Sequence, residues 1–473
     1  MPPADTVLRS LPGPAALAGS APASVGGWGG GQTASVSLLR PGDAEQLPAI
    51  VAGCSRSRSG RARSAGAIAR GMGRSYGDAA QLAGGAVLDI TGLKRFELDA
   101  DKGVVTAQAG ITIGELLAAL APQGWVVPVV PGTQHVTVGG AIASDIHGKN
   151  HGTAGTFGSH VLALGLLTAA GELLDLSPGG SERLFEATVG GMGLTGVIVW
   201  ARVKLRPVQS ALLSVDTDRV RGLDDAFAAL RAPGGSHRVA WLDLLGPDLA
   251  RGIVTRAEHR GGRDVTGARG SATVRSRLTV PARFPSGLLR AGTIRAYNEY
   301  RYRSSPRRQL GHVESFGSHM FPLDALDAWP RLYGRRGFLQ YQFVVPGGGE
   351  RTLQGVIERL RRSAVPCYLA ILKDFGPAND APLSFPLEGW TLTLDLPRGA
   401  PGLAALLNEF DELVVQAGGR VYLTKDIRLA PETLTAMYPR LGEWRACRDK
   451  ADPEGLWRSD LAQRTGLVSA GRR

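Results

Sequence analysis

The chain has 473 residues, of which 43% are hydrophobic and 20% are charged, a composition that suits a globular protein with two domains and two apolar cores. Lysine and arginine number 54 against 42 for aspartate and glutamate, so the formal net charge of +12 favours acidic partners such as phosphates or a membrane surface. Three cysteines without a Cys-x-x-Cys pair argue against a disulfide scaffold and a structural zinc site, and they fit a reducing compartment.

The N-terminal segment, residues 1–35, is rich in alanine, glycine, serine and proline and is expected to be a flexible leader. It contains no continuous apolar region of a signal peptide, and no later segment approaches the ~18–20 apolar residues of a membrane span. We therefore expect a cytoplasmic protein, either free in solution or peripheral at the inner face of the membrane.

The first half of the chain reads as short strands separated by glycine turns. Residues 38–51 predict a strand and then a helix that begins near Asp43, and residues 55–64 predict a low-complexity loop. The clearest helix is at 113–120, and the further strands are expected at 86–90, 104–109, 126–129, 161–168 and 197–205. Short strands with few helices indicate an α+β layer rather than a doubly wound sheet.

The second half has a different pattern. Helices are expected at 223–230 and 352–363, strands at 338–345 and 390–396, and a final strand and helix at 420–423 and 431–438. The basic region from 256 to 310 is expected to form mobile loops, whose arginines are either solvated or face an anionic bilayer. No known nucleic-acid-binding module accompanies these arginines, so we expect no binding to nucleic acid.

Three glycine-rich segments are the first candidates for a ligand-binding site. The first is Gly-Met-Gly-Arg-Ser-Tyr-Gly-Asp at 71–78, where glycines let several backbone N–H groups converge on an anion. Its G-x-G-x-x-x-G spacing is one residue off the dinucleotide fingerprint, so alone it is compatible with an ordinary loop. Two more segments, 130–151 and 189–196, are similarly rich in small residues. Together the three indicate an extended cofactor with phosphates and a planar ring.

Two histidines in the second segment, His147 and His151, have the spacing of a metal pair on a helix. The glycines around them oppose a rigid helix, and no glutamate lies between them. We therefore expect no metal site.

The three segments, in this order, resemble the PP-type FAD-binding domain of the vanillyl-alcohol oxidase (PCMH-type) family of FAD-linked oxidases. Several members of that family bond the flavin to a histidine in the first loop, at G-x-G-H-S. Arg74 holds that position here and cannot form the bond. The resemblance therefore implies FAD that is bound non-covalently.

Further motifs resemble the decaprenylphosphoryl-β-D-ribose 2-oxidase subfamily, over nearly the whole chain. They include Gly-Trp-Gly at 27–29, Asp-Ile-His-Gly-Lys-Asn-His at 145–151, Pro-Ser-Gly at 285–287, Gln-Tyr-Gln-Phe at 340–343 and Ala-Met-Tyr-Pro-Arg at 436–440. The resemblance implies a two-domain α+β flavoprotein. The FAD-binding domain would span 1–206, a substrate domain built on an antiparallel sheet would span 207–418, and the C-terminal segment 419–473 would complete the first domain.

The resemblance also assigns site residues. Lys425 and His147 are the candidates for taking the hydroxyl proton and orienting the substrate. The residues expected to bind FAD are Ala69, Arg70, Gly71, Met72, Gly73, Arg74, Ser75, Tyr76, Gly77, Asp78, Gly132, Thr133, Thr137, Val138, Gly139, Gly140, Ser144, Asp145, Ile146, His147, Ile198 and Tyr422. The residues expected to bind the substrate are Trp241, Gln342, Lys373, Thr391, Thr393 and Lys425.

Two of these substrate residues depart from the mycobacterial pattern. Thr393 stands where those members have a pocket cysteine, and Thr391 replaces an asparagine. The pocket beside the flavin is therefore altered, and inhibitors that attack that cysteine are expected to fail.

The implied reaction is oxidation of the 2-hydroxyl of a polyprenylphosphoryl-β-D-ribose to the 2-keto sugar by hydride transfer to flavin N5. It would be the first half of an epimerisation to an arabinose precursor of the cell wall, completed by a partner short-chain reductase. One alternative is a sugar alcohol or aldonolactone oxidase that uses oxygen, like D-arabinono-1,4-lactone oxidase. Another is a flavin-fold binding module without activity.

Overall fold

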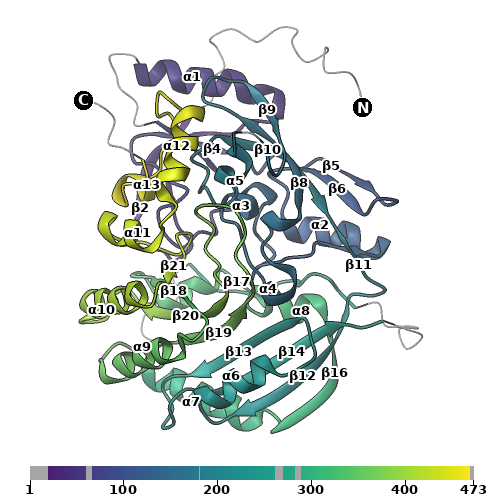
Figure 1. The fold of residues 1–473 in the computed structure, drawn as a ribbon, viewed down its shortest axis with the longest axis vertical. Helices are drawn as coiled ribbons and strands as arrows, with labels where there is room; N and C mark the ends of the chain where they lie inside the picture. The colour runs from purple at the N-terminus through teal and green to yellow at the C-terminus, as the bar shows by residue number, and fades with distance from the viewer. Residues whose placement is uncertain (1–19, 60–65, 181, 262–269, 283–288, 469–473) are drawn as a thin grey trace.

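The computed structural model describes residues 20–59, 66–180, 182–261, 270–282 and 289–468, and Figure 1 shows them as two adjoining halves. One half holds a four-stranded and a five-stranded sheet, and the other is built on an eight-stranded sheet. The prediction of an α+β fold with an antiparallel sheet in the second half is confirmed. The Pro-Ser-Gly motif at 285–287 and residues 1–19 of the predicted leader lie outside the described residues.

The four-stranded sheet begins in the predicted leader. β1 (Ala21–Gly26) pairs antiparallel with β2 (Thr33–Leu39), in a register from Ala21–Leu38 to Gly26–Thr33. The expectation of a flexible leader as far as residue 35 was therefore wrong for the residues of these two strands. β4 (Ala86–Asp89) pairs in parallel with β2 and with β3 (Ala67–Arg70). α1 (Leu47–Ser59) extends into the loop expected at 55–64, of which residues 60–64 are not described.

The five-stranded sheet is antiparallel, in the order β5 (Phe96–Asp99), β6 (Val104–Gln108), β10 (Val197–Lys204), β8 (Val161–Leu167) and β9 (Leu173–Leu176). α2 (Ile113–Leu120) begins at a capping box of Thr112 and Glu115, which satisfies its first N–H groups. The strand expected at 126–129 is shorter than predicted, because only β7 (Trp125–Val126) finds a partner, β11 (Arg206–Pro207).

Helices that the pattern did not predict fill the turns of this half. α3 (Val138–Ala143), α4 (His151–Ala154) and α5 (Leu184–Thr188) are only four to six residues long, too short for a period to be visible in the sequence. A shared apolar core joins α2 and α3 to the sheet.

The eight-stranded sheet runs β16 (Arg308–Ser315), β12 (Leu212–Val220), β14 (Arg251–His259), β13 (His237–Asp243), β19 (Leu369–Phe375), β20 (Gly389–Pro397), β18 (Phe338–Pro346) and β21 (Arg420–Val421). The expectation of mobile loops over 256–310 was wrong where this region forms β14, α7 (Ala291–Ser304) and β16. Residues 262–269 and 283–288 of the same region are not described.

The two faces of this sheet differ in chemistry because successive side chains on a strand point to opposite sides. One face is apolar and packs against α6 (Leu223–Arg231), α9 (Glu350–Arg362) and α10 (Leu403–Gln416), in a core that includes Ala240, Leu242, Val254, Leu372 and Leu394. The residues between them form the opposite face, which we call the polar face because it carries Thr255, Lys373 and Thr393 among apolar residues such as Trp241. That face lines a cavity.

The C-terminal segment returns to the first half through α11 (Pro431–Met437), α12 (Leu441–Ala451) and α13 (Asp460–Arg464). Trp457 forms a parallel β-bridge with Ala67 of β3. The guanidinium of Arg464 donates to both carboxylate oxygens of Asp78, at 2.9 and 2.8 Å, and to Asp426 at 2.9 Å. The boundaries at 206 and 418 stay a prediction, and β21 of the tail extends the large sheet.

No helix in the described ranges combines the length and the hydrophobicity that crossing a bilayer requires. Within the same ranges, no group of three or more histidine, cysteine, aspartate or glutamate side chains is placed to hold a metal ion.

Candidate active site

A cavity of about 650 Å³ lies where the glycine-rich loops of the first half meet the polar face of the large sheet. The strands contribute alternate residues to its lining: Val239 and Trp241 from β13, Ile253 and Thr255 from β14, Leu369, Ile371 and Lys373 from β19, Thr393 from β20 and Gln340 from β18. A cavity of this size accommodates a large ligand.

Most of the predicted site residues line this one cavity. They are Ala69, Arg70, Gly71, Met72, Gly73, Arg74, Ser75, Tyr76, Gly132, Thr133, Thr137, Gly139, Gly140, Ser144, Ile146, His147, Ile198, Trp241, Lys373, Thr393, Tyr422 and Lys425. The lining does not include Gly77, Asp78, Val138, Asp145, Gln342 and Thr391.

The residues outside the lining hold those within it. The carboxylate of Asp78 binds Arg464, and that of Asp145 is buried and accepts hydrogen bonds from the N–H of Gly158 and from Ser384. Val138 is buried in the apolar core beside α2. We therefore interpret Asp78, Asp145 and Val138 as supports of the loops rather than as ligand contacts.

The first glycine loop follows β3 and leaves backbone donors free. Within the part of the chain that the structure describes, the N–H groups of residues 72–75 donate to no protein acceptor, and Gly73 has a positive φ of 62°. A Cβ on Gly71 would lie 2.3 Å from Oγ1 of Thr137, which caps α3 through the N–H of Gly140. The loop therefore forms a close-packed cradle whose N–H donors are left available to a ligand, as an anion site requires.

Arg74 occupies the position at which a covalent flavin link would need a histidine. Its guanidinium lies over the ring of Trp28, 3.6 Å from the ring centroid, and within the described ranges its buried Nε has no hydrogen-bond partner. Trp28 belongs to the turn between β1 and β2, so the hairpin that was expected to be flexible forms part of the cavity wall.

His147 is held by the large sheet. Nε2 of Gln342 donates to Nε2 of His147 at 3.0 Å and to Oγ1 of Thr391 at 3.0 Å, and all three side chains are buried. Burial holds the pKa of His147 well below its ordinary value, with the charges of Lys373 and Lys425 adding to the effect. The imidazole is therefore neutral, and its buried Nδ1 has no hydrogen-bond partner among the residues that the structure describes.

Lys425 lies in the turn after β21, with Nζ 5.4 Å from the ring centroid of Tyr76. Burial and then the charge of Lys373 lower the pKa of the Lys425 ammonium, while the carboxylate of Asp395 acts in the opposite direction. Asp395 is fully buried on β20, where Gln340 and Tyr333 donate to its two oxygens. An amine with a lowered pKa can exchange a proton near neutral pH.

Two further lysines line the cavity. Burial lowers the pKa of Lys373 to about 8 and that of Lys149 to about 7, where the charge of Lys373 adds to the effect. Lys149 lies within the predicted segment 145–151 but was not singled out, although a lysine among glycines next to a predicted ligand could have been. Arg301 and Tyr297 of α7 also line the cavity, and they were missed because their segment was interpreted as loops.

These residues fit FAD. The free N–H groups of 72–75 suit a pyrophosphate, and the small residues Gly132, Gly139 and Gly140 in the lining leave room for a planar ring against the backbone. The unpartnered Nε of Arg74 and Nδ1 of His147 are donors that a polar ligand would satisfy.

The sequence also matches known families and relatives. Residues 37–177 match the FAD binding domain family, and residues 396–465 match the D-arabinono-1,4-lactone oxidase family. The chain is 39% identical over 454 residues to decaprenylphosphoryl-β-D-ribose oxidase of Mycolicibacterium smegmatis, an alignment that covers 93% of this chain and 97% of the relative.

More distant relatives share the architecture. L-gulono-1,4-lactone dehydrogenase of Mycobacterium tuberculosis is 24% identical over 391 residues, which cover 80% of this chain and 86% of the relative. The solved structure of BBE-like 1 from Physcomitrella patens superposes with a TM-score of 0.66 at 15% identity, covering 94% of this chain and 97% of that one, and it shows the shared fold.

Proposed function

The chain belongs to the family of decaprenylphosphoryl-β-D-ribose oxidase, among the FAD-linked oxidases, and from this premise we propose that it oxidises the 2-hydroxyl of a polyprenylphosphoryl-β-D-ribose to the 2-keto sugar. The observation that carries the proposal is a half-buried lysine of lowered pKa, Lys425, in the same cavity as the anion cradle of residues 72–75.

FAD supplies the hydride acceptor when it is bound. We assign its pyrophosphate to the glycine loop at 71–75 and its ring to the wall made by Gly139, Gly140 and Tyr422. Because an arginine stands at the position of the covalent histidine, we propose that this FAD is bound without a covalent link.

Lys425 is assigned as the group that takes the hydroxyl proton. Its neutral amine can accept a proton once the substrate hydroxyl lies beside it, and burial makes that neutral form accessible. Asp395, held by Gln340 and Tyr333, lies close enough to interact with the charge that Lys425 acquires. The carboxylate therefore stabilises the protonated lysine that the step produces.

His147 is assigned a different role. Its Nε2 is engaged by the amide of Gln342, so the nitrogen that could act as a base is not free, and the opposite nitrogen carries the proton. The imidazole can donate that N–H to a ligand in the cavity. We propose that His147 orients substrate or cofactor and that Lys425 moves the proton.

The substrate pocket is proposed to lie along the polar face of the large sheet. Lys373 supplies positive charge for the phosphate, while Thr393 and Trp241 shape the wall. Thr391 acts indirectly, because its hydroxyl accepts from Gln342 and donates to the carbonyl of Phe343.

A lipid-linked substrate requires access to a membrane, and the second half exposes apolar side chains suited to that. Leu278 and Tyr300 are each 71% exposed, and Leu310 is 60% exposed. They lie in the basic region of the chain, so we propose peripheral contact with the anionic inner face of the membrane from the cytoplasm. We propose further that a short-chain reductase consumes the 2-keto product.

The match of residues 396–465 to the D-arabinono-1,4-lactone oxidase family favours a second candidate, the oxidation of a soluble aldonolactone with oxygen. An anaerobic flavin-reduction assay separates the two. We expect farnesylphosphoryl-β-D-ribose to bleach the flavin absorbance and aldonolactones to leave it unchanged. Bleaching by the lactones alone, with rapid peroxide formation in air, would overturn the proposal.

A further inference from the structure

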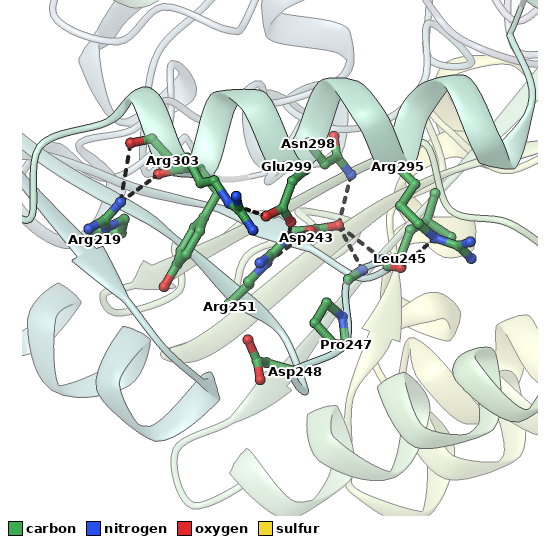
Figure 2. A network of polar contacts seen from close by, with 12 residues as sticks. Arg219, Asp243, Leu245, Pro247, Asp248, Arg251, Arg295, Asn298, Glu299 and Arg303 are labelled. Atoms are coloured by element: carbon green, nitrogen blue, oxygen red, sulfur yellow. Dashed lines mark hydrogen bonds and ion pairs between the residues drawn. The ribbon is translucent and has the colours of Figure 1, made fainter.

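Helix α7 crosses the polar face of the large sheet with little apolar packing of its own. Asn298 is its one buried residue. Figure 2 shows that the helix is held instead by a polar clamp on β13 and β14, which we define as Asp243, Arg251, Asn298 and Glu299. The helix is therefore placed by hydrogen bonds and ion pairs of defined direction.

The clamp centres on Asp243, which is fully buried. Its carboxylate accepts from Arg251 at 3.0 and 2.8 Å and from Nδ2 of Asn298 at 2.8 Å. Arg251 also binds Glu299, which in turn binds Arg303 (Figure 2). Since Asp243 and Trp241 are two residues apart on β13, the clamp fixes α7 next to Trp241 on the same face of the sheet.

This placement brings two residues of α7 to the cavity. Tyr297 and Arg301 are four residues apart, on one side of the helix, and both line the cavity wall. The guanidinium carbon of Arg301 lies 4.6 Å from the ring centroid of Trp241. Among the described residues no carboxylate pairs with Arg301, whereas Arg251 and Arg303 are both paired.

The surroundings of Arg301 are cationic but not free of acids. Lys149 and Lys373 line the same cavity, and on β13 and β19 Trp241 and Lys373 are diagonal neighbours, because Trp241 pairs with Ile371. The acidic residues of the lining have partners of their own: Glu314 pairs with His319, and Asp324 accepts from Thr133 and from the N–H of Gln134. Their partners leave the guanidinium of Arg301 available to a ligand.

We propose that Arg301, held against Trp241 by the clamp, binds the phosphate group that links sugar and lipid in the substrate, and so selects a phosphorylated sugar over a neutral one. A planar guanidinium presents paired donors that match two phosphate oxygens, and it keeps them while stacked on an aromatic ring. This inference rests on the proposed function, because it names the part of that substrate which the second half of the protein recognises.

The test compares two ribosides with the FAD-loaded enzyme under anaerobic conditions, farnesylphosphoryl-β-D-ribose and the neutral octyl β-D-ribofuranoside. We expect Arg301→Gln to raise KM for the phosphorylated riboside about 10- to 100-fold and to leave its kcat nearly unchanged. KM and kcat for the neutral riboside should also stay nearly unchanged. Arg301→Lys should fall between the two. The matched control is Arg303→Gln, which removes the same charge from the same helix but from a side chain paired with Glu299. It should behave like the wild type.

Equal effects of Arg301→Gln on both ribosides, or no effect on either, would overturn the inference. Direct binding of farnesyl phosphate to the oxidised enzyme, measured by calorimetry, separates this result from failure of the proposed function. If the wild type turns over neither riboside but binds farnesyl phosphate, and Arg301→Gln loses that binding, the anion site stands and the proposed reaction falls. Equal binding by both proteins would overturn the site.

Discussion

Gln342 and His147 meet through a hydrogen bond of 3.0 Å between their Nε2 atoms, which joins the large sheet to the second glycine-rich segment. The amide N–H₂ of Gln342 can only donate, so the contact makes Nε2 of His147 an acceptor and places the imidazole proton on Nδ1. One glutamine thus sets both the tautomer and the position of a histidine at the junction of the two halves. The roles proposed for His147 and Lys425 rest on this contact.

Replacing Lys425 with methionine should abolish most of the proton transfer while keeping the shape of the side chain. We expect flavin reduction by the riboside to fall about 10²- to 10⁴-fold, with the visible spectrum of bound FAD unchanged. Rapid-mixing absorbance measurements under nitrogen report the rate. Lys450→Met, an exposed lysine on α12, is the control. A Lys425→Met enzyme as fast as the control would remove the assigned role.

The rate of flavin reduction should rise with pH as Lys425 loses its proton. The neutral amine is the active form, and because burial and Lys373 lower the pKa of Lys425, that form becomes populated below the ordinary lysine value of 10.5. The group is therefore inactive on the acid side and active on the alkaline side of its titration. A profile of the reduction rate from pH 5.5 to 9.5 checks the direction, about the range in which buried lysines titrate. A falling profile would contradict the assignment.

Changing Gly71 to alanine should weaken FAD binding. The added Cβ would lie 2.3 Å from Oγ1 of Thr137, so the cap of α3 or the loop at 71–75 has to shift. The ratio of flavin to protein absorbance after purification measures the loss. Gly442→Ala on α12, where nothing lies within 4 Å of the new methyl group, should retain full FAD. Full FAD content in both variants would show that the cradle tolerates the shift.

The flavin should leave the protein when the protein is denatured. Arg74 stands at the position of the covalent histidine, and its guanidinium is stacked on Trp28. Acid precipitation is expected to release all the yellow colour into the supernatant, and the denatured polypeptide should have the mass of its sequence alone. A polypeptide that keeps the chromophore would require a different attachment residue.

Asp243→Asn should loosen α7 without touching the cavity lining. Breaking a buried ion pair from one side costs about 3–5 kcal/mol of unfolding free energy, and we expect a lower denaturation midpoint together with a raised KM for the phosphorylated riboside. The control is Asp248→Asn, in the neighbouring loop of Figure 2, where the backbone carbonyl rather than the carboxylate contacts Arg361. A stability loss without any change in KM would separate the clamp from substrate binding.

Much of the fold could be predicted because the hydrophobic pattern of a helix or strand is contained in its own residues. The helix at 113–120 and the strand at 338–345 carry their patterns within a few residues, and the structure places both within one residue of the prediction. The region 256–310 could not be predicted in this way. Its arginines read as solvated charge, but Arg256 and Arg308 pair with Asp218 of another strand, β12, and such pairs are invisible in a linear pattern.

The same difference between local and long-range information separates the site residues that could be predicted from those that could not. The glycine segments indicate a ligand-binding site because clusters of small residues can be recognised in the sequence without the structure. Arg301 and Trp28 do not, because their sequence neighbours give no sign of the cavity: Trp28 reaches it through a hairpin, and Arg301 through a helix that the clamp places. Cavity residues outside the glycine-rich segments therefore needed the three-dimensional arrangement to be recognised.

The hydrogen bonds of Arg464 to both Asp78 and Asp426 have a consequence for the synthesis of this chain in the cell. Asp78 ends the first glycine loop and Asp426 follows the proposed proton acceptor, so the two meet only after the ribosome has released residues nearly 390 positions beyond the loop. A nascent chain therefore cannot form this contact between the first glycine loop and the turn that carries Lys425 until α13 has been synthesised.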